Sequence, residues 1–321
     1  AHCDAAYTRA KALEINQNEY AVGAPHQEWP AGRPAKTTPL TAVLAGEGAV
    51  FGARNGWERP LWFRPAGFDG PTQAPSFQRQ PWFDAVGAEC RAVREAAGLV
   101  VIPGFSRFLL EGAGAAAHLD RLLATPLPPV GQVRLAYGLT ASGGVLVETT
   151  VARLAAERFL LASAAAAEWH DWAWLAADLP PGVTLANATA EQETLALSGP
   201  QAREILEQAS GQSLGDLRWR HARALGIAGE TLMVLRFGYS GELGYELHPR
   251  PEQGPAVYAA LRAAGARPVG TLALDSLRLE KGYPAWKSEL EIKVSALASG
   301  LERFIAWDKG DFVGRAALLA E

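Results

Sequence analysis

The stretch "VRLAYGLTASGGVLVETTVARLAAERFLLAS" (133–163) predicts a run of antiparallel strands. Two segments rich in apolar and β-branched residues flank Gly143 and Gly144, and a glycine pair between such segments is typical of a hairpin turn. A third apolar segment follows directly. Strands that are joined without an intervening helix argue against a doubly wound parallel sheet and predict an α+β fold.

Strand, turn and helix recur on both sides of this stretch. The segments "FLLEGAGAAAHLDRLL" (108–123) and "TLALSGPQAREILEQA" (194–209) share that order, which predicts two related α+β units with mixed sheets packed by helices. We therefore divide the chain into a connector at 1–80, a first unit at 81–190, and a second unit at 191–321 that includes the start of a C-terminal region.

The connector is rich in proline, glycine and aromatic residues, and it predicts an arm that packs by its tryptophans. Within residues 37–63 we expect one short helix followed by an ordered loop. The segment "WFDAVGAECRAVREAAGLVV" (82–101) then predicts an amphipathic helix that ends near Gly98 and a short buried strand.

Composition limits the classes of function. The chain has 321 residues, of which 49% are hydrophobic and 20% charged, as in an ordinary globular protein with a substantial core. Its net charge of −4 argues against general affinity for nucleic acid or for an anionic membrane. No apolar run approaches the roughly 18 residues of a membrane helix, and the given residues show no signal-peptide pattern. We expect a cytoplasmic protein.

Cysteine and histidine give no sign of a metal site. Cys3 and Cys90 are far apart, which favours free thiols in a reducing compartment over a disulfide. The six histidines are scattered and none belongs to a ligand cluster, so no metal is predicted.

Three short motifs are weak. "GEGAVFG" (46–52) has the wrong glycine spacing for a dinucleotide loop and no clear strand before it. "GYSGE" (238–242) is similar to a hydrolase nucleophile elbow, but Glu242 stands where that motif needs glycine, so Ser240 is interpreted as a turn residue. "WHDW" (169–172) is interpreted as the polar face of a helix, because adjacent helical positions point about 100° apart.

Two acids lie inside expected strands. Glu148 interrupts the apolar run of "GGVLVETTV" (143–151), and an outward position on an edge strand is the alternative to a functional one. In "GYELH" (244–248), Tyr245 and Leu247 face one side and Glu246 the other, where its carboxylate could accept two hydrogen bonds from one ligand. Glu242, in the preceding turn, is expected to be solvated.

A third stretch, "ALDSLRLEKGYPAW" (273–286), predicts a helix. Its spacing brings Asp275 and Arg278 together, and an ion pair that stabilises the helix would explain both without a ligand.

Together these stretches resemble a known family. The order "GGVLVETTV", "GYSGELGYEL", "LDSLRLEKGYPAW" and "DKGDFVGRAAL" resembles the folate-binding family of the glycine cleavage T protein, an aminomethyltransferase. The segments "AGRPAKTTPL" and "VFGARNGWERPLWF" resemble the connector that follows the flavin domain in dimethylglycine and sarcosine dehydrogenases and oxidases. The resemblance covers nearly the whole chain and implies the aminomethyltransferase-like fold.

The resemblance implies a function and a set of site residues. In that family a flavin half oxidises an N-methylglycine to an imine, and the folate half captures the one-carbon unit on tetrahydrofolate as 5,10-methylenetetrahydrofolate. By position, Glu246 would accept the pterin's donor edge, Tyr239 would line the pocket, and Arg278 would meet the anionic tail. Glu148 would lie near the reactive nitrogens as the catalytic carboxylate.

The chain also departs from the family pattern. The family often has Asp at the position of Glu148, and a pocket tyrosine is replaced by Leu135, with Tyr137 two residues further along the same face. Pro284 and Lys287 stand where Arg and Gly are frequent. By the resemblance, we expect the family's flavin domain to lie outside this sequence, before residue 1, and the family's C-terminal β-barrel to begin about where the sequence stops. The resemblance therefore implies a fragment or separate subunit, with FAD supplied by a flavin oxidase domain or subunit outside the chain.

Two other functions and one neutral interpretation stay open. A folate-dependent demethylase could form 5-methyltetrahydrofolate from an O- or S-methyl donor, and a folate-fold scaffold could bind without catalysis. An α+β domain with solvated acids would have neither function.

Overall fold

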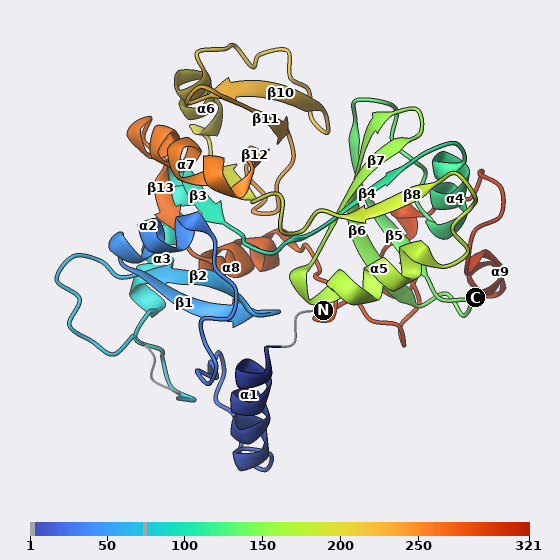
Figure 1. Ribbon diagram of the computed structural model, residues 1–321. Helices are drawn as coiled ribbons and strands as arrows, with labels where there is room; N and C mark the ends of the chain where they lie inside the picture. Colours follow the sequence, from blue (N-terminus) through green and yellow to red (C-terminus); the bar gives the residue numbers. More distant parts are fainter. Residues whose placement is uncertain (1–3, 73–75) are drawn as a thin grey trace.

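The computed structural model describes residues 4–72 and 76–321, and two sheets organise it (Figure 1). The larger sheet has the strand order β10-β11-β12-β9-β3-β13. Its strands are β3 (Gly98–Val101), β9 (Leu195–Ser198), β10 (Ala222–Ile227), β11 (Glu230–Leu235), β12 (Gly244–His248) and β13 (Arg267–Val269). The sheet is mixed, because β13 runs parallel to β3 while the other neighbours are antiparallel.

The second sheet is antiparallel and has the order β5-β6-β7-β4-β8. Its strands are β4 (Ser106–Glu111), β5 (Val133–Leu139), β6 (Val145–Ala155), β7 (Arg158–Ser163) and β8 (Thr184–Asn187). The hairpin predicted from Gly143 and Gly144 joins β5 to β6, and Gly143 has the positive φ of 86° that such turns favour. This register places Glu148 opposite Tyr137.

Helices pack on both sheets, apart from α1. In chain order the helices are α1 (Ala5–Gln17), α2 (Pro39–Gly46), α3 (Phe83–Glu95), α4 (Ala115–Leu122), α5 (Glu168–Ala176), α6 (Ala202–Ser210), α7 (Gly254–Ala263), α8 (Thr271–Lys281) and α9 (Arg315–Ala320). Figure 1 shows α1 projecting from the body of the molecule, and no residue of α1 is buried.

The expected loop in residues 37–63 is a hairpin instead. After α2, strands β1 (Ala49–Arg54) and β2 (Trp57–Phe63) pair antiparallel across a turn in which Asn55 and Gly56 both have positive φ, 51° and 81°. This is the backbone of a type I′ hairpin turn, for which Asn-Gly is the preferred pair. The prediction of a loop was wrong because the flanking strands lack a clean alternation of apolar and polar residues.

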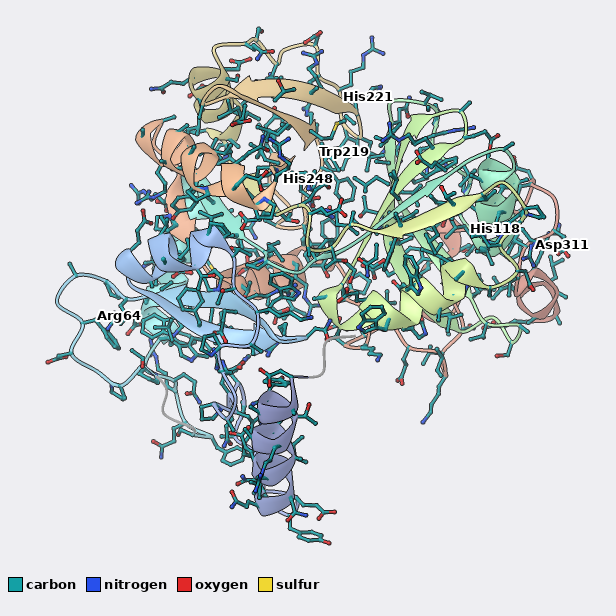
Figure 2. All side chains as sticks on the ribbon, viewed as in Figure 1. Arg64, His118, Trp219, His221, His248 and Asp311 are labelled. Atoms are coloured by element: carbon teal, nitrogen blue, oxygen red, sulfur yellow. The ribbon has the colours of Figure 1, made fainter. Side chains whose placement is uncertain are left out.

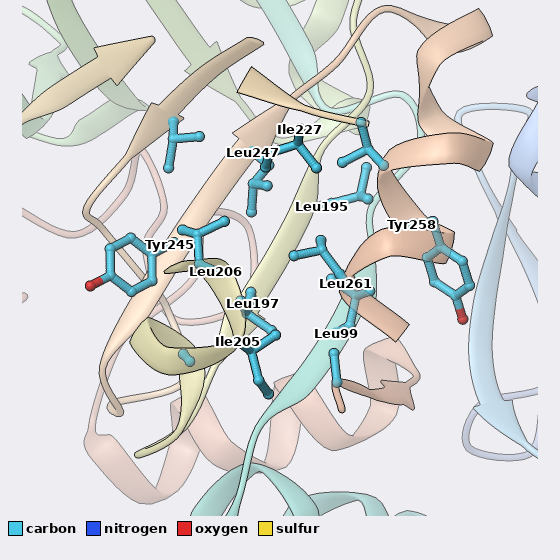
Figure 3. Packing of buried hydrophobic residues seen from close by; sticks show 14 of the residues in the cluster. Leu99, Leu195, Leu197, Ile205, Leu206, Ile227, Tyr245, Leu247, Tyr258 and Leu261 are labelled. Carbon is cyan, nitrogen blue, oxygen red and sulfur yellow. The ribbon is translucent and has the colours of Figure 1, made fainter. Parts of the chain in front are cut away.

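Three clusters of buried apolar residues hold the helices and the C-terminal segment against the sheets. One cluster fills the space between the larger sheet and its helices, with Leu197, Tyr245 and Leu247 fully buried on one face (Figure 3). A second lies between the antiparallel sheet and α4 and α5. A third joins β5 and β6 to the segment after α8, through Leu290 and Phe312 among others. The chain therefore returns to the second sheet after it has completed the first.

The predicted α+β class, with sheets packed by helices, is confirmed. The sheets do not divide at 80/81 or 190/191. Strand β3 belongs by sequence to the first predicted unit but pairs with β9 and β13 of the second, and the β1–β2 hairpin packs against α8. Strand β3 of the first predicted unit is therefore part of the sheet of the second, and residues after α8 of the second unit pack on the sheet of the first. Cys90 is a half-buried free cysteine, and Cys3 lies outside the described residues.

Candidate ligand-binding site

A cavity of about 1020 Å³ lies where the two sheets meet. Its wall combines side chains from β5, β6 and β7 of the antiparallel sheet with residues of β9 and β12 of the larger one, and helix α8 and the segments at 282–286 and 299–304 complete it. A volume of this size suits a small molecule or cofactor. Figure 2 labels Trp219, at the cavity wall, and His248, on β12.

Glu148 lies in this wall, on β6. Its Oε2 atom is buried and has no hydrogen-bond partner within the described residues. Burial raises the pKa of the carboxyl to about 8; Arg278 acts in the opposite direction and Glu289 in the same one. An outward position on an edge strand is therefore excluded, since β6 is flanked by β5 and β7 and the acid faces a cavity.

Glu246 reaches the same cavity from β12. The predicted alternation is confirmed, since Tyr245 and Leu247 are fully buried in the core and Glu246 and His248 lie on the other face. Burial raises the pKa of the Glu246 carboxyl, and the charge of Arg107 opposes this.

Arg107, on β4, is fully buried beneath Glu246. Its Nη2 donates to Thr194 Oγ1 and to His248 Nδ1, the latter at 2.8 Å, so His248 carries its proton on Nε2. That Nε2 lies 3.8 Å from Glu246 Oε2. Burial and then Arg107 lower the pKa of His248 well below its usual range, which keeps the imidazole neutral. Because His248 is neutral, the positive charge of Arg107 is the one that acts on the Glu246 carboxyl in this cluster.

Tyr239 and Leu135 also line the cavity. The Tyr239 hydroxyl donates to Pro284 O at 3.0 Å, and its ring stacks with Tyr283. Leu135 lies two residues from Tyr137 on β5, and both contribute to the wall, as expected from their shared strand face. Tyr137 is 1% exposed and meets the ring of Phe304 edge to face.

Arg278 is placed differently from its predicted role. It does not belong to the cavity lining, and its guanidinium is 2.7 Å from both Asp275 and Glu289. The helix-stabilising ion pair that the spacing allowed is therefore present, and Glu289 completes it. An arginine held by two carboxylates has little positive charge left for an anionic ligand.

The expectation that Glu242 is solvated was wrong, because it forms an ion pair with Arg94 at 2.5 Å, and Arg94 also binds Glu280 on α8. In "WHDW", which was interpreted as a polar helix face, His170 is exposed, while Asp171 is 1% exposed and contacts His170 Nδ1 at 2.8 Å.

Sequence reasoning assigned no role to several cations of the cavity wall. Arg59, Arg134, Arg220 and Arg303 line the cavity. Trp219 is 48% exposed and stacks on Phe237 with ring centroids 5.6 Å apart, which forms an aromatic platform in the wall. The aromatic composition of "RWR" (218–220) was the available signal.

Within residues 4–72 and 76–321, no group of three His, Cys, Asp or Glu side chains could hold a metal ion. No helix in this part of the chain combines the length and the apolar character that crossing a bilayer requires.

Comparison with known proteins identifies the family. Residues 40–309 match the model of the GCVT N-terminal domain. The mitochondrial dimethylglycine dehydrogenase of Homo sapiens is 34% identical over 322 residues, which cover 97% of this chain and 37% of that protein. The chain thus spans little more than a third of that relative's length. An aminomethyltransferase of Thermosynechococcus vestitus is 31% identical over 287 residues, covering 88% of this chain and 72% of that protein.

Solved structures agree. The glycine cleavage system aminomethyltransferase T from Bartonella henselae superposes with a TM-score of 0.75 at 27% identity, over 89% of this chain and 74% of the other. The mixed and antiparallel sheets described above are therefore an aminomethyltransferase-like fold, and the chain belongs to the family of the GCVT N-terminal domain.

Proposed function

We propose that the cavity binds tetrahydrofolate and that the chain transfers to it a one-carbon unit derived from an N-methylated glycine. The observation that carries this proposal is the pair Glu148 and Glu246, which face one cavity from two sheets. Neither carboxylate accepts a hydrogen bond from the described residues. A buried carboxylate that accepts no hydrogen bond is costly, and it is retained where a ligand or a reaction uses it.

The residues of the wall fit a reduced pterin. Its amino group and neighbouring ring N–H form a planar donor edge, which matches a carboxylate such as Glu246. The rings of Tyr239 and Phe237 offer apolar area to a flat ligand. The folate nitrogens supply the nucleophile that captures the one-carbon unit, to give 5,10-methylenetetrahydrofolate.

Glu148 is the residue we assign to proton transfer. A carboxyl whose pKa is near 8 carries a proton at neutral pH and can exchange it with a basic nitrogen beside it. The charge of Arg107 opposes the effect of burial and favours the ionised form of Glu246, which accepts hydrogen bonds, so we assign the two acids different roles in one cavity.

The proposed function also needs a partner that oxidises the N-methylated amine. The human relative's name describes a dehydrogenase of dimethylglycine, and the chain spans 37% of it. We assign the oxidation of the amine to the imine to a flavin domain or subunit outside this chain, and the capture of the one-carbon unit to the cavity.

Isothermal titration with tetrahydrofolate tests the proposal. We expect saturable binding by the chain and a loss of affinity of about 10- to 100-fold in Glu246→Gln, because charge-assisted hydrogen bonds are lost. The matched control is Glu191→Gln, an exposed acid, which should bind like the unsubstituted chain. Binding that is absent, or equal in both variants, contradicts the proposal.

Turnover with the flavin partner separates the alternatives. A folate product with the mass of 5-methyltetrahydrofolate favours an O- or S-demethylase. Unchanged turnover in Glu148→Gln favours a binding scaffold in which this acid has no catalytic part.

A further inference from the structure

Arg59 lies in the cavity wall and has no role in the function proposed above. It is the third residue of β2, opposite Gly52 of β1, in the hairpin that the sequence presented as a loop. The cavity residues Ile102, Phe105 and Leu274 are apolar neighbours in the same lining. A charged side chain among such residues needs a compensating partner.

The protein supplies only part of that compensation. Arg59 Nε donates to Pro103 O at 2.9 Å, but Nη2 is buried without a hydrogen-bond partner. Among the described residues no carboxylate lies within ion-pair distance of Arg59, and the charge that acts on it is the like charge of Arg54. Burial, with Arg54 second, lowers its pKa to about 10, so Arg59 stays protonated at neutral pH.

Other charged residues of the chain show the contrast. Glu58 on the same strand is held by Arg33 through two hydrogen bonds of 2.6 and 2.9 Å. Arg278 has two carboxylate partners at 2.7 Å. Four arginines line the cavity, and among them Arg59 is the one, within the described residues, that has a buried guanidinium nitrogen without a hydrogen-bond partner.

We propose that Arg59 is the anchor for a ligand carboxylate in the cavity. Guanidinium groups bind carboxylates through two parallel N–H donors, which would use the unpartnered Nη2. Thr271, the first residue of α8, lies in the same wall, and the first turn of that helix contains no acid, so its amide end adds positive potential there.

The inference rests on the proposed function for the identity of the ligand. Both ligands of that proposal carry a carboxylate: the amino acid skeleton of the N-methylated amine, and the glutamyl tail of the folate. A buried cation does not distinguish the two sources, so the experiment must do so.

Two substitutions separate charge from shape. Arg59→Gln keeps an N–H donor for Pro103 O and removes the charge. Arg59→Lys keeps the charge but loses the two parallel N–H donors of the guanidinium group. The matched control is Arg64→Gln, an exposed arginine just beyond β2 that lies away from the cavity (Figure 2). Equal thermal unfolding midpoints of the variants and the unsubstituted chain establish that folding is unchanged.

Titration with tetrahydrofolate, and with 6-methyltetrahydropterin, which lacks the tail, identifies the source. If the folate carboxylate is bound, Arg59→Gln weakens tetrahydrofolate about 10- to 100-fold, Arg59→Lys restores part of the loss, and the tailless pterin binds equally to all variants. If the carboxylate of the imine formed from the amine is bound, folate affinity is unchanged, and in the complex with the flavin partner a smaller share of the one-carbon units is captured on tetrahydrofolate and a larger share is released as formaldehyde by hydrolysis.

The inference is overturned if Arg59→Gln changes neither quantity, or weakens the tailless pterin as much as the folate. Failure of the proposed function has a different signature, namely no folate binding by the unsubstituted chain. In that case acetate serves as the probe, and the anchor predicts that acetate raises the unfolding midpoint of the unsubstituted chain and of Arg64→Gln but not of Arg59→Gln. Equal shifts in all three would reject the anchor.

Discussion

Replacing Glu148 by glutamine is expected to stabilise the protein at neutral and alkaline pH. The carboxyl oxygen Oε2 is buried without a partner, and burial is the main reason that its pKa is raised to about 8. Glutamine has nearly the same shape but cannot ionise. The substitution therefore removes the cost of a buried negative charge while it leaves the packing of β6 intact.

The magnitude follows from the pKa difference between the folded and unfolded states. In the unfolded chain the carboxyl titrates near its ordinary value of 4.5, so the folded state holds a proton that the unfolded state releases between these values. The favourable contribution of the acid is complete below pH 4.5 and is lost as the pH rises through 8. At 1.36 kcal/mol per unit, the glutamine variant should gain less than about 1 kcal/mol at pH 5, about 3 kcal/mol at pH 7 and at most about 5 kcal/mol above pH 8.

Denaturant unfolding of both proteins at pH 5, 6, 7 and 8 measures this difference. Glu191→Gln is the control, because this acid is exposed and its substitution should give a difference near zero at every pH. A free-energy difference for Glu148→Gln that stays constant between pH 5 and pH 8 would refute the reasoning, since the effect would then come from packing and not from ionisation.

Three further substitutions test other parts of the structure. Glu89 accepts hydrogen bonds from two buried backbone amides at 2.7 and 2.8 Å, so Glu89→Ala should lower the free energy of unfolding by about 2–4 kcal/mol; an unchanged denaturation midpoint would contradict this. Arg107→Met removes the cation that opposes protonation of Glu246, so the loss of folate affinity on acidification should move to higher pH, and an identical pH profile of the Kd would show that Arg107 does not act on this acid. Arg94→Ala frees Glu242 from a partly exposed ion pair and should cost about 1 kcal/mol or less; the cost should vanish in 1 M NaCl, and a salt-independent difference would argue for lost packing instead.

Local patterns predicted the parts of the fold that depend on local contacts. The glycine pair at 143–144 marks the hairpin between β5 and β6. Strand alternation predicted that Glu246 lies on the face of β12 that points away from the core, while Tyr245 points into it. The Asn55-Gly56 turn is an equally local signal. It was missed because the residue types of β1, AVFGAR, and of β2, WERPLWF, do not alternate between apolar and polar, although burial alternates along β1.

The remaining parts of the site depend on contacts between distant segments. Arg107 stands in "SRFLLE" (106–111) like an exposed strand residue, but its partner His248 lies 141 residues later in the chain. Likewise, the cavity neighbours of Arg59 come from α8 and from the loop before β4. A single sequence does not reveal such pairings. The tail-binding role that the resemblance implied for Arg278 stays a prediction, and in the structure this residue pairs with Asp275 and Glu289.

The cavity takes one acid from each sheet, and this has a consequence for unfolding. The two sheets have separate main cores and share a smaller apolar cluster that includes Leu160 and Leu235. A molecule that bridges Glu148 and Glu246 would add a second link between the sheets, and opening either sheet would then require this link to be broken. Saturating ligand should therefore make the thermal transition sharper, and the increase in cooperativity would report occupancy of the cavity even where no chemistry takes place.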